Sequence, residues 1–261
     1  MNKEITNREI AIAYHTSGEG DALVFIHGFT EHPGIWNSFK EQLSSNFKII
    51  IPSLPAHGES DYPKNMTMDF MADCIAEILK AESITKATLV GHSMGGYAML
   101  NFASRYPQFC KAICLFHSSA TADSEEVKSN RERTIEIIRN NHGKFLHQFI
   151  PSLFAENHRE ELSAQIQSQI EEASKIEAEG LIACMNAMKD RKNHLDVLAE
   201  INCPVGFVIG KQDSRVNFQS ILAQAALPKE SHVLILEDCG HMGYLEKPKE
   251  TLEFLKYFAS L

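Results

Sequence analysis

Runs of apolar residues recur along the chain and are separated by stretches of mixed polarity. Most of the runs are nearly continuous, which is typical of strands buried on both faces of a parallel sheet. These runs cover residues 22–27, 48–52, 87–92, 112–117, 205–210 and 232–237. Residues 9–15 alternate between polar and apolar side chains instead, which predicts a half-buried strand.

Stretches long enough for helices lie between the predicted strands. They cover residues 34–44, 67–82, 94–106, 217–227 and 248–260. Strands that alternate with helices predict β-α-β units and an α/β fold with a parallel sheet. Ligands of open parallel sheets bind beyond the carboxyl ends of the strands. The residues that follow each strand are therefore the first candidates for a functional site.

Residues 121–200 break this alternation. They contain no buried-strand run, and their apolar residues recur at the spacing of amphipathic helices. An insert of this length is too long for a simple crossover between two strands. We therefore expect one domain overall, with an α/β core formed by residues 1–120 and 201–261 and an all-helical cap at residues 121–200.

Charge and cysteine content narrow the class of protein. The chain of 261 residues has 34 acidic and 25 basic side chains and a net charge of -9. An acidic surface repels phosphate backbones and anionic lipid, so we expect neither nucleic acid nor stable membrane association. The first residues do not resemble a signal peptide, which favours a cytoplasmic protein. The six cysteines lack C-x-x-C spacing, which favours reduced thiols and no metal site.

The segment after the predicted strand at 87–92 reads Gly91-His92-Ser93-Met94-Gly95 and then continues as a predicted helix. This matches G-x-S-x-G between a strand and a helix, the context in which the motif presents a nucleophilic serine. Glycines flank the turn because a side chain there would clash, and the turn exposes the serine hydroxyl. A phosphate-binding loop would carry lysine after the glycines, where this chain has Tyr97.

A serine nucleophile needs a base, normally histidine, and an acid that orients it. His241 follows the last predicted strand, and Asp213 lies three residues beyond the strand at 205–210. The order Ser93, Asp213, His241 is that of one known class of triad. Asp123 is the main alternative acid, and Glu237 and Asp238 lie too near His241 in sequence. The other histidines that end strands are expected to pack or to bond loops: His27, His92 and His117.

Two backbone N–H groups are candidates for an oxyanion hole. One belongs to Met94, the residue after the candidate nucleophile, and the other to Phe29, in the loop after the strand at 22–27. Gly28 allows the backbone to turn so that the Phe29 N–H can face Ser93. Donors of this kind stabilise the charge that develops on a carbonyl oxygen during acyl transfer.

With these motifs in place, the chain resembles the α/β-hydrolase superfamily, in the branch with a serine nucleophile and a helical lid. The matching segments are HGFTEHPGIW, IPSLPAHGESD, GHSMGG, GKQDSRV and GHMGYLEKP. The resemblance implies a mostly parallel eight-stranded sheet flanked by helices, with the active site between core and lid. The chain departs from the usual pattern at Ser53 and Ala56, where relatives usually carry Asp and Gly.

The resulting hypothesis is a serine hydrolase that cleaves a small carboxylic ester or thioester through an acyl-enzyme, without metal or organic cofactor. The partner is a small-molecule acyl substrate, and a homodimer is left open. Within the same fold, a carbon–carbon bond hydrolase, a perhydrolase and a lyase of the menaquinone pathway stay open. A small-molecule receptor that keeps the triad is the alternative outside enzymology.

The insert carries two sets of residues with more than one interpretation. Basic residues on it suit a polycarboxylate substrate, but a solvated helix face is favoured for them: Arg131, Arg133, Arg139 and Lys144. Large apolar residues on it indicate an apolar interior, and their helical spacing favours lid core over cavity wall: Phe145, Phe149, Phe154, Met185 and Met188.

Overall fold

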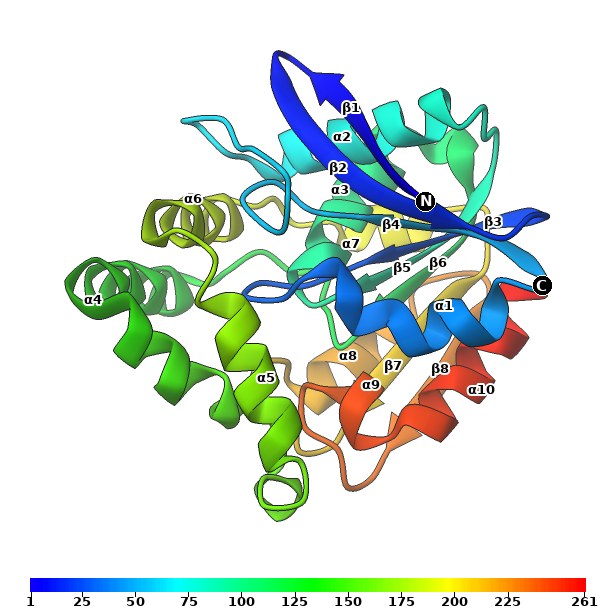
Figure 1. Ribbon diagram of the computed structural model, residues 1–261. Coiled ribbons are helices and arrows are strands. Elements are labelled where there is room, and N and C mark those ends of the chain that lie inside the picture. Colours follow the sequence, from blue (N-terminus) through cyan, green and yellow to red (C-terminus); the bar gives the residue numbers. More distant parts are fainter.

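A single eight-stranded sheet runs through the computed structural model, which describes all 261 residues (Figure 1). The strand order across the sheet is β1-β2-β4-β3-β5-β6-β7-β8. The strands are β1 (Asn2–Asn7), β2 (Ile10–Ser17), β3 (Asp21–Ile26), β4 (Phe47–Pro52), β5 (Ala87–His92), β6 (Cys110–Phe116), β7 (Val205–Gly210) and β8 (Ser231–Leu236). The predicted α/β class and the mostly parallel sheet are confirmed.

The sheet is antiparallel at one side only. β2 pairs antiparallel with both β1 and β4, and all the other neighbours are parallel. β1 was not predicted from its own pattern, because it lies at the sheet edge and Ile5 is its one aliphatic side chain. β8 forms the opposite edge and alternates between exposed and more buried residues. The expectation that residues 232–237 are buried on both faces was therefore wrong.

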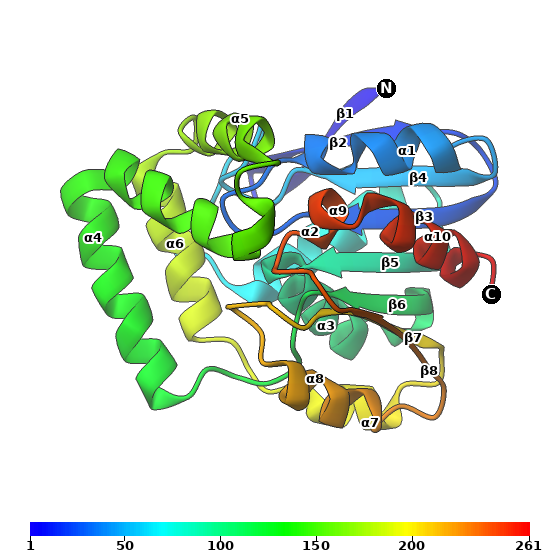
Figure 2. The ribbon, with the colours of Figure 1, turned by 90° about the horizontal axis from the view of Figure 1, so that it is seen from below.

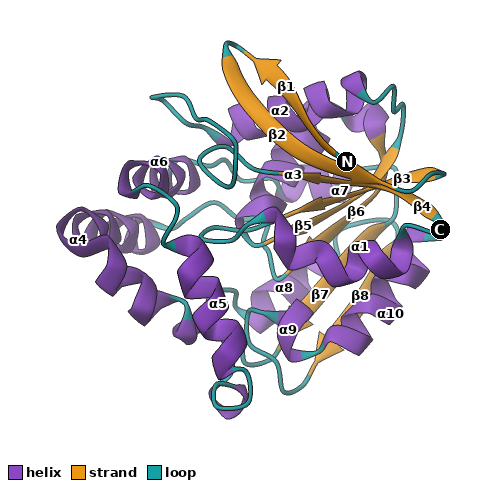
Figure 3. Cartoon of the chain, in the orientation of Figure 1, coloured by secondary structure: helices purple, strands orange, loops and turns teal.

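Helices cover both faces of the sheet (Figures 2 and 3). α2 and α3 pack together on one face, and α9 and α10 lie on the other. The core helices are α1 (Asn37–Leu43), α2 (Met68–Ala81), α3 (Met94–Arg105), α8 (Phe218–Ala225), α9 (Gly243–Glu246) and α10 (Pro248–Ala259). None of the helices is both long and apolar enough to cross a membrane.

The insertion between β6 and β7 is helical. It contains α4 (Glu125–Phe149), α5 (Ser163–Ala173), α6 (Ala178–Lys189) and α7 (Leu195–Glu200). α4, α5 and α6 form a layer beyond one end of the strands, whereas α7 packs against α3 of the core (Figures 1 and 2). α4 is interrupted at Asn141, whose φ of -161° and ψ of 81° are not helical. The Asn141 side chain accepts a bond from the Lys144 N–H at 2.8 Å and so caps the second half of the helix.

One departure from the family pattern has a backbone consequence. Ala56 adopts φ 69°, the left-handed region that favours glycine. The glycine that relatives usually carry at this point therefore suits the conformation better than alanine does. The loop is otherwise held by Ser60, whose hydroxyl donates to the Ser53 carbonyl at 2.8 Å and accepts from the Ala13 N–H at 2.9 Å.

Candidate active site

Ser93 lies on the turn that joins β5 to α3, with φ 50° and ψ -116°. A side chain in this region costs roughly 1–2 kcal/mol, so the surrounding structure must impose the conformation. The glycines around it are required by close packing. A Cβ on Gly91 would lie 2.6 Å from the Gly96 Cα, and one on Gly95 would lie 2.5 Å from the Ile26 and His27 carbonyl oxygens.

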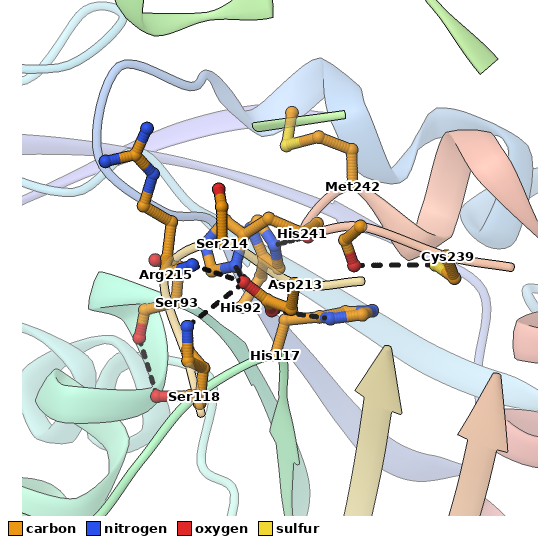
Figure 4. Close-up of polar contacts among 12 residues, drawn as sticks. His92, Ser93, His117, Ser118, Asp213, Ser214, Arg215, Cys239, His241 and Met242 are labelled. Atoms are coloured by element: carbon orange, nitrogen blue, oxygen red, sulfur yellow. Dashed lines mark hydrogen bonds and ion pairs between the residues drawn. The ribbon is translucent and has the colours of Figure 1, made fainter. Parts of the chain in front are cut away.

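His241 follows β8 and lies at the carboxyl end of the sheet, buried against its neighbours. Its Nδ1 lies 3.0 Å from Asp213 Oδ1 and 2.8 Å from Asp213 Oδ2 (Figure 4). An imidazole that gives Nδ1–H to a carboxylate is left with Nε2 as its acceptor. The structure therefore joins the predicted base to the predicted acid and fixes the tautomer of the ring.

Asp213 is held by several other donors. Its Oδ1 accepts from the backbone N–H groups of Arg215 at 2.8 Å and Val216 at 3.1 Å. Its Oδ2 also lies 3.1 Å from His117 Nδ1. Burial opposes ionisation of the carboxyl, but the neighbouring His241 and His117 outweigh it and hold the pKa of Asp213 well below its usual range. Asp213 is therefore an anion across the whole range in which enzymes work.

His117 is a second imidazole on the same carboxylate, and it is fully buried at the end of β6. Burial lowers the pKa of His117 despite the attraction of Asp213, so the ring is neutral and donates through Nδ1. A Cβ on Gly243 would lie 2.3 Å from its Nε2, so glycine is required there. His117, Asp213 and His241 present possible metal-ligand atoms within 4.8 Å of one another, and hydrogen bonds account for these contacts.

A cavity of about 340 Å³ lies between the strand ends and the insertion. Its wall includes Ser93, His241 and Phe29, so three of the five predicted site residues face one space. The Phe29 N–H has no hydrogen-bond partner, as a free donor requires. Met94 is fully buried at the first position of α3, and only its backbone N–H remains a candidate for contact with a substrate. The remaining wall residues are Glu31, His92, Tyr97, Val127, Asn130, Arg131, Thr134, Phe149, Leu153, Met185, Met188, Ser214 and Arg215.

A buried ion pair, which sequence reasoning missed, forms part of this cavity wall. His92 Nδ1 lies 2.9 Å from the Glu31 carboxylate, and its Nε2 lies 2.9 Å from the His241 carbonyl oxygen. Because both ring nitrogens face acceptors, both must carry hydrogen, and the ring is an imidazolium. Burial disfavours that charge, but Glu31 outweighs it and raises the pKa of His92. On Glu31, burial opposes ionisation, yet His92 lowers the pKa of the carboxyl to about 2.

The Glu31–His92 pair connects three of the four loops that carry the predicted site residues, those of Phe29, Ser93 and His241. Glu31 accepts hydrogen bonds from the Gly28 N–H, next to Phe29, and from the Tyr244 hydroxyl at 3.0 Å. His92 directly precedes the candidate nucleophile and holds the backbone of His241. The signal available in the sequence was Glu31 within HGFTE, a charged residue close behind a strand that reads as buried.

Glu246 holds the histidine loop in a similar way. Its carboxylate accepts from the N–H groups of Gly240 at 2.9 Å and Met242 at 3.0 Å, on both sides of His241. It also accepts from the Ala155 N–H at 3.0 Å, in the insertion. A direct backbone bond from His241 to the Leu153 carbonyl, at 2.7 Å, completes the link. The position of His241 therefore depends on the insertion as well as on the core.

The structure also locates the alternative acid and the insertion residues that the sequence left with two interpretations. Asp123 accepts from Arg131 and from Arg191, and it makes no bond to His241. Arg131 lies on the cavity wall, which corrects its interpretation as part of a solvated face, whereas three residues are exposed as expected: Arg133, Arg139 and Lys144. The expectation of lid core holds for Phe145 and Phe154. Met185 and Met188 are buried in the core as expected but also line the cavity, and Phe149 is a partly buried residue of the cavity wall.

A second hollow, of about 630 Å³, lies between the end of α3 and α7. Its lining includes the thiols of Cys110 and Cys203 and the exposed Ser104 hydroxyl, but no histidine that could activate them. Burial raises the pKa of these thiols to about 12 and about 11, so neither is a thiolate near neutral pH. The chemistry-bearing groups therefore gather at the cavity beside Ser93.

Comparison with known proteins agrees with this architecture. The sequence profile of the alpha/beta hydrolase fold matches residues 21–248. A thermophilic esterase from Thermogutta terrifontis superposes with a TM-score of 0.92 at 28% identity, over 99% of this chain and 97% of that one. Lipase 1 of Psychrobacter immobilis is 25% identical over 93% of this chain and 78% of the lipase.

Other relatives share only part of their length with this chain. An uncharacterised protein of Mycobacterium tuberculosis is 33% identical over 104 residues, which are 40% of this chain and 30% of that protein. Such partial matches carry no information on substrate.

Proposed function

We propose, from the premise that the chain belongs to the alpha/beta hydrolase fold family, that it cleaves a small carboxylic ester or thioester by acyl transfer through Ser93. The observation that carries the proposal is the contact of His241 Nδ1 with Asp213, at 2.8 Å, on a ring that shares a cavity wall with Ser93. The similarity of the chain to an esterase and a lipase also supports the proposal.

In this mechanism His241 Nε2 takes the proton of the Ser93 hydroxyl as its oxygen attacks the carbonyl carbon. The N–H groups of Phe29 and Met94 stabilise the oxyanion. His241 then protonates the leaving alcohol or thiol, and an acyl-enzyme remains on Ser93. Water, deprotonated by His241, attacks the acyl carbon, and His241 then returns the proton to the Ser93 oxygen as the carbon–oxygen bond to Ser93 breaks and the acid leaves. Asp213 stabilises the imidazolium that forms in each half-reaction.

The test combines covalent labelling with turnover. A fluorophosphonate probe should label the wild-type protein, and p-nitrophenyl esters from acetate to long acyl chains should be hydrolysed. Ser93→Ala should abolish labelling and lower kcat by about 10⁶-fold, since the nucleophile is lost. Ser104→Ala, on the exposed side of α3, is the matched control and should behave as wild type.

Three outcomes contradict the proposal. Absence of labelling and turnover in the wild type favours a receptor, and turnover of a ring-cleavage dienoate alone favours a carbon–carbon bond hydrolase. Activity that EDTA removes would point instead to a metal held by His117, Asp213 and His241.

A further inference from the structure

The charged side chains on the cavity wall are unevenly distributed. Two arginines, Arg131 and Arg215, lie on the wall beside a single carboxylate, Glu31. Glu31 is already engaged by the His92 imidazolium, the Gly28 N–H and the Tyr244 hydroxyl. Its charge is therefore compensated within the core and is not available to balance either arginine.

Arg131 belongs to a cluster that has more positive than negative charge. Asp123 accepts from both Arg131 and Arg191, at 2.5 Å for Arg191, so two guanidinium groups share one carboxylate. Arg191 is further engaged by the Tyr97 ring, whose centroid lies 4.0 Å from its Cζ. Arg131 Nη1 faces only the sulfurs of Met185 and Met188, at 3.7 and 3.5 Å. Thioethers are weak acceptors, so this N–H group still lacks a strong partner on the cavity side.

Arg215 carries a second positive charge on the wall, which Asp213 attracts without forming an ion pair with it. Its guanidinium donates to the Ser152 hydroxyl at 2.5 Å and lies over the Phe149 ring, with Cζ 4.9 Å from the centroid. None of the ion pairs in the structure involves Arg215. Asp213, two residues earlier, directs its carboxylate toward the histidines and the backbone, and the Arg215 side chain extends away from it (Figure 4).

We propose that this cavity binds esters whose acyl group carries a carboxylate, which pairs with Arg215 and Arg131. The inference rests on the proposed function and specifies its substrate class. A cavity of about 340 Å³ is at the lower end of the range for ligand sites, which suits a short acyl group. The protein as a whole has a net charge of -9, so these arginines set a local charge opposite to that of the molecule. Arginine suits this role because its planar fork matches a carboxylate.

The test uses two p-nitrophenyl esters of nearly equal size, the hemiglutarate and the valerate. Only the first carries an acyl carboxylate. The wild type should have the higher kcat/KM for the hemiglutarate, and the ratio of the two values should fall as salt is added. Arg215→Gln should lower this ratio about 10-fold to 100-fold, mainly through KM, since a charge-assisted hydrogen bond is lost. Arg215→Lys, which keeps the charge, should restore part of the ratio.

Arg133→Gln is the matched control, because Arg133 is an exposed arginine on the same helix as Arg131 and does not line the cavity. Arg133→Gln should leave kcat/KM unchanged for both esters. A wild-type preference for the valerate, or a ratio that Arg215→Gln does not change, overturns the inference. If the valerate is hydrolysed in a Ser93-dependent way under those outcomes, the proposed function stands, whereas failure on both esters together with absent labelling defeats the proposed function itself.

Discussion

At the scale of single residues, the Asp213 carboxylate combines a structural and a chemical role. Backbone N–H groups and two imidazoles surround it, so every oxygen is engaged while the group stays ionised. The bonds to the Arg215 and Val216 N–H groups fix the turn after β7. The bond to His241 sets which nitrogen of that ring is free. One side chain thus couples loop geometry to the protonation of the candidate base.

Asp213→Asn should therefore damage chemistry far more than folding. An amide can present N–H where His241 needs an acceptor, which allows the ring to adopt the other tautomer. We expect kcat to fall about 10⁴-fold with little change in Tm, measured by ester turnover and thermal denaturation. Asp123→Asn is the comparison, because it removes the alternative acid. An equal loss of kcat in Asp123→Asn would contradict the assignment.

The Glu31–His92 pair makes stability depend on pH in both directions. The pKa of Glu31 is lowered from 4.5 to about 2, so its contribution is complete above pH 4.5 and is lost as the pH falls toward 2. The pKa of His92 is raised from 6.5, so its contribution is complete below pH 6.5 and is lost as the pH rises through the folded value. The pair therefore contributes most to the free energy of unfolding between pH 4.5 and pH 6.5.

Glu31→Gln should destabilise the protein by about 3–5 kcal/mol at pH 5.5, because it leaves a buried imidazolium without its counter-ion. The difference from wild type should shrink toward pH 2.5 and again at alkaline pH. Urea unfolding at these pH values measures the difference in free energy of unfolding. Glu59→Gln is the control, because Glu59 is an exposed acid without an ion pair. A difference that is constant with pH would show that the pair is not ionised.

At the scale of elements, the β5–α3 turn depends on glycines that leave room for neighbouring backbone. A Cβ at Gly95 would meet carbonyl oxygens at the end of β3, and backbone in a central strand cannot move aside cheaply. By contrast, a Cβ at Gly143, in α4, would meet only the Asn141 side chain at 3.9 Å. Close packing therefore requires glycine at position 95 but not at position 143, although both residues lie in helices.

Gly95→Ala should lower the free energy of unfolding by about 1–3 kcal/mol, through forced overpacking. Gly143→Ala should raise it by about 0.4–1 kcal/mol, because the unfolded chain loses freedom and the site is open. Denaturant unfolding of both variants measures the contrast. Equal effects of the two substitutions would mean that the turn relaxes more readily than its packing suggests.

Elements whose pattern reflects burial were predictable from the sequence, and those decided by position in the sheet were not. The fully buried strands β5 and β7 read as continuous apolar runs, as burial on both faces requires. β1 has Ile5 as its one aliphatic residue, since an edge strand needs little apolar surface. At the site, strand ends indicated Ser93, Asp213 and His241. The Glu31–His92 pair and the contact of His117 with Asp213 depend on distances between loops, which one sequence does not encode locally.

At the scale of the whole molecule, the strand ends carry the candidate site residues and the insertion covers them. Residues far apart in the chain meet because parallel strands end at one edge. The cavity side of the insertion could not be predicted, since helical periodicity says which residues are buried but not what they face. Phe145 and Met185 both lie on apolar helix faces, yet only Met185 lines the cavity. Helical spacing therefore does not reveal which residues of the insertion line the cavity.

The accessibility of the cysteine thiols measures whether the core of the molecule stays closed. Cys203 is partly buried and the other five cysteines are buried, none in a disulfide. We expect a thiol reagent such as DTNB to react with at most one thiol in the native protein and with six after unfolding. Reducing agent should leave Tm unchanged. Rapid reaction of several native thiols would indicate that the core opens readily.

The backbone of Ser93 has a consequence for how such a chain can evolve. Glycine adopts φ 50° freely, and serine does not. On the proposed mechanism, turnover requires serine at position 93, although the backbone conformation there favours glycine. A duplicate released from selection for activity would gain stability from that single exchange and become a well-folded binding protein. On the proposed mechanism, the turn that presents the hydroxyl therefore also offers a route of one substitution from a hydrolase to a receptor.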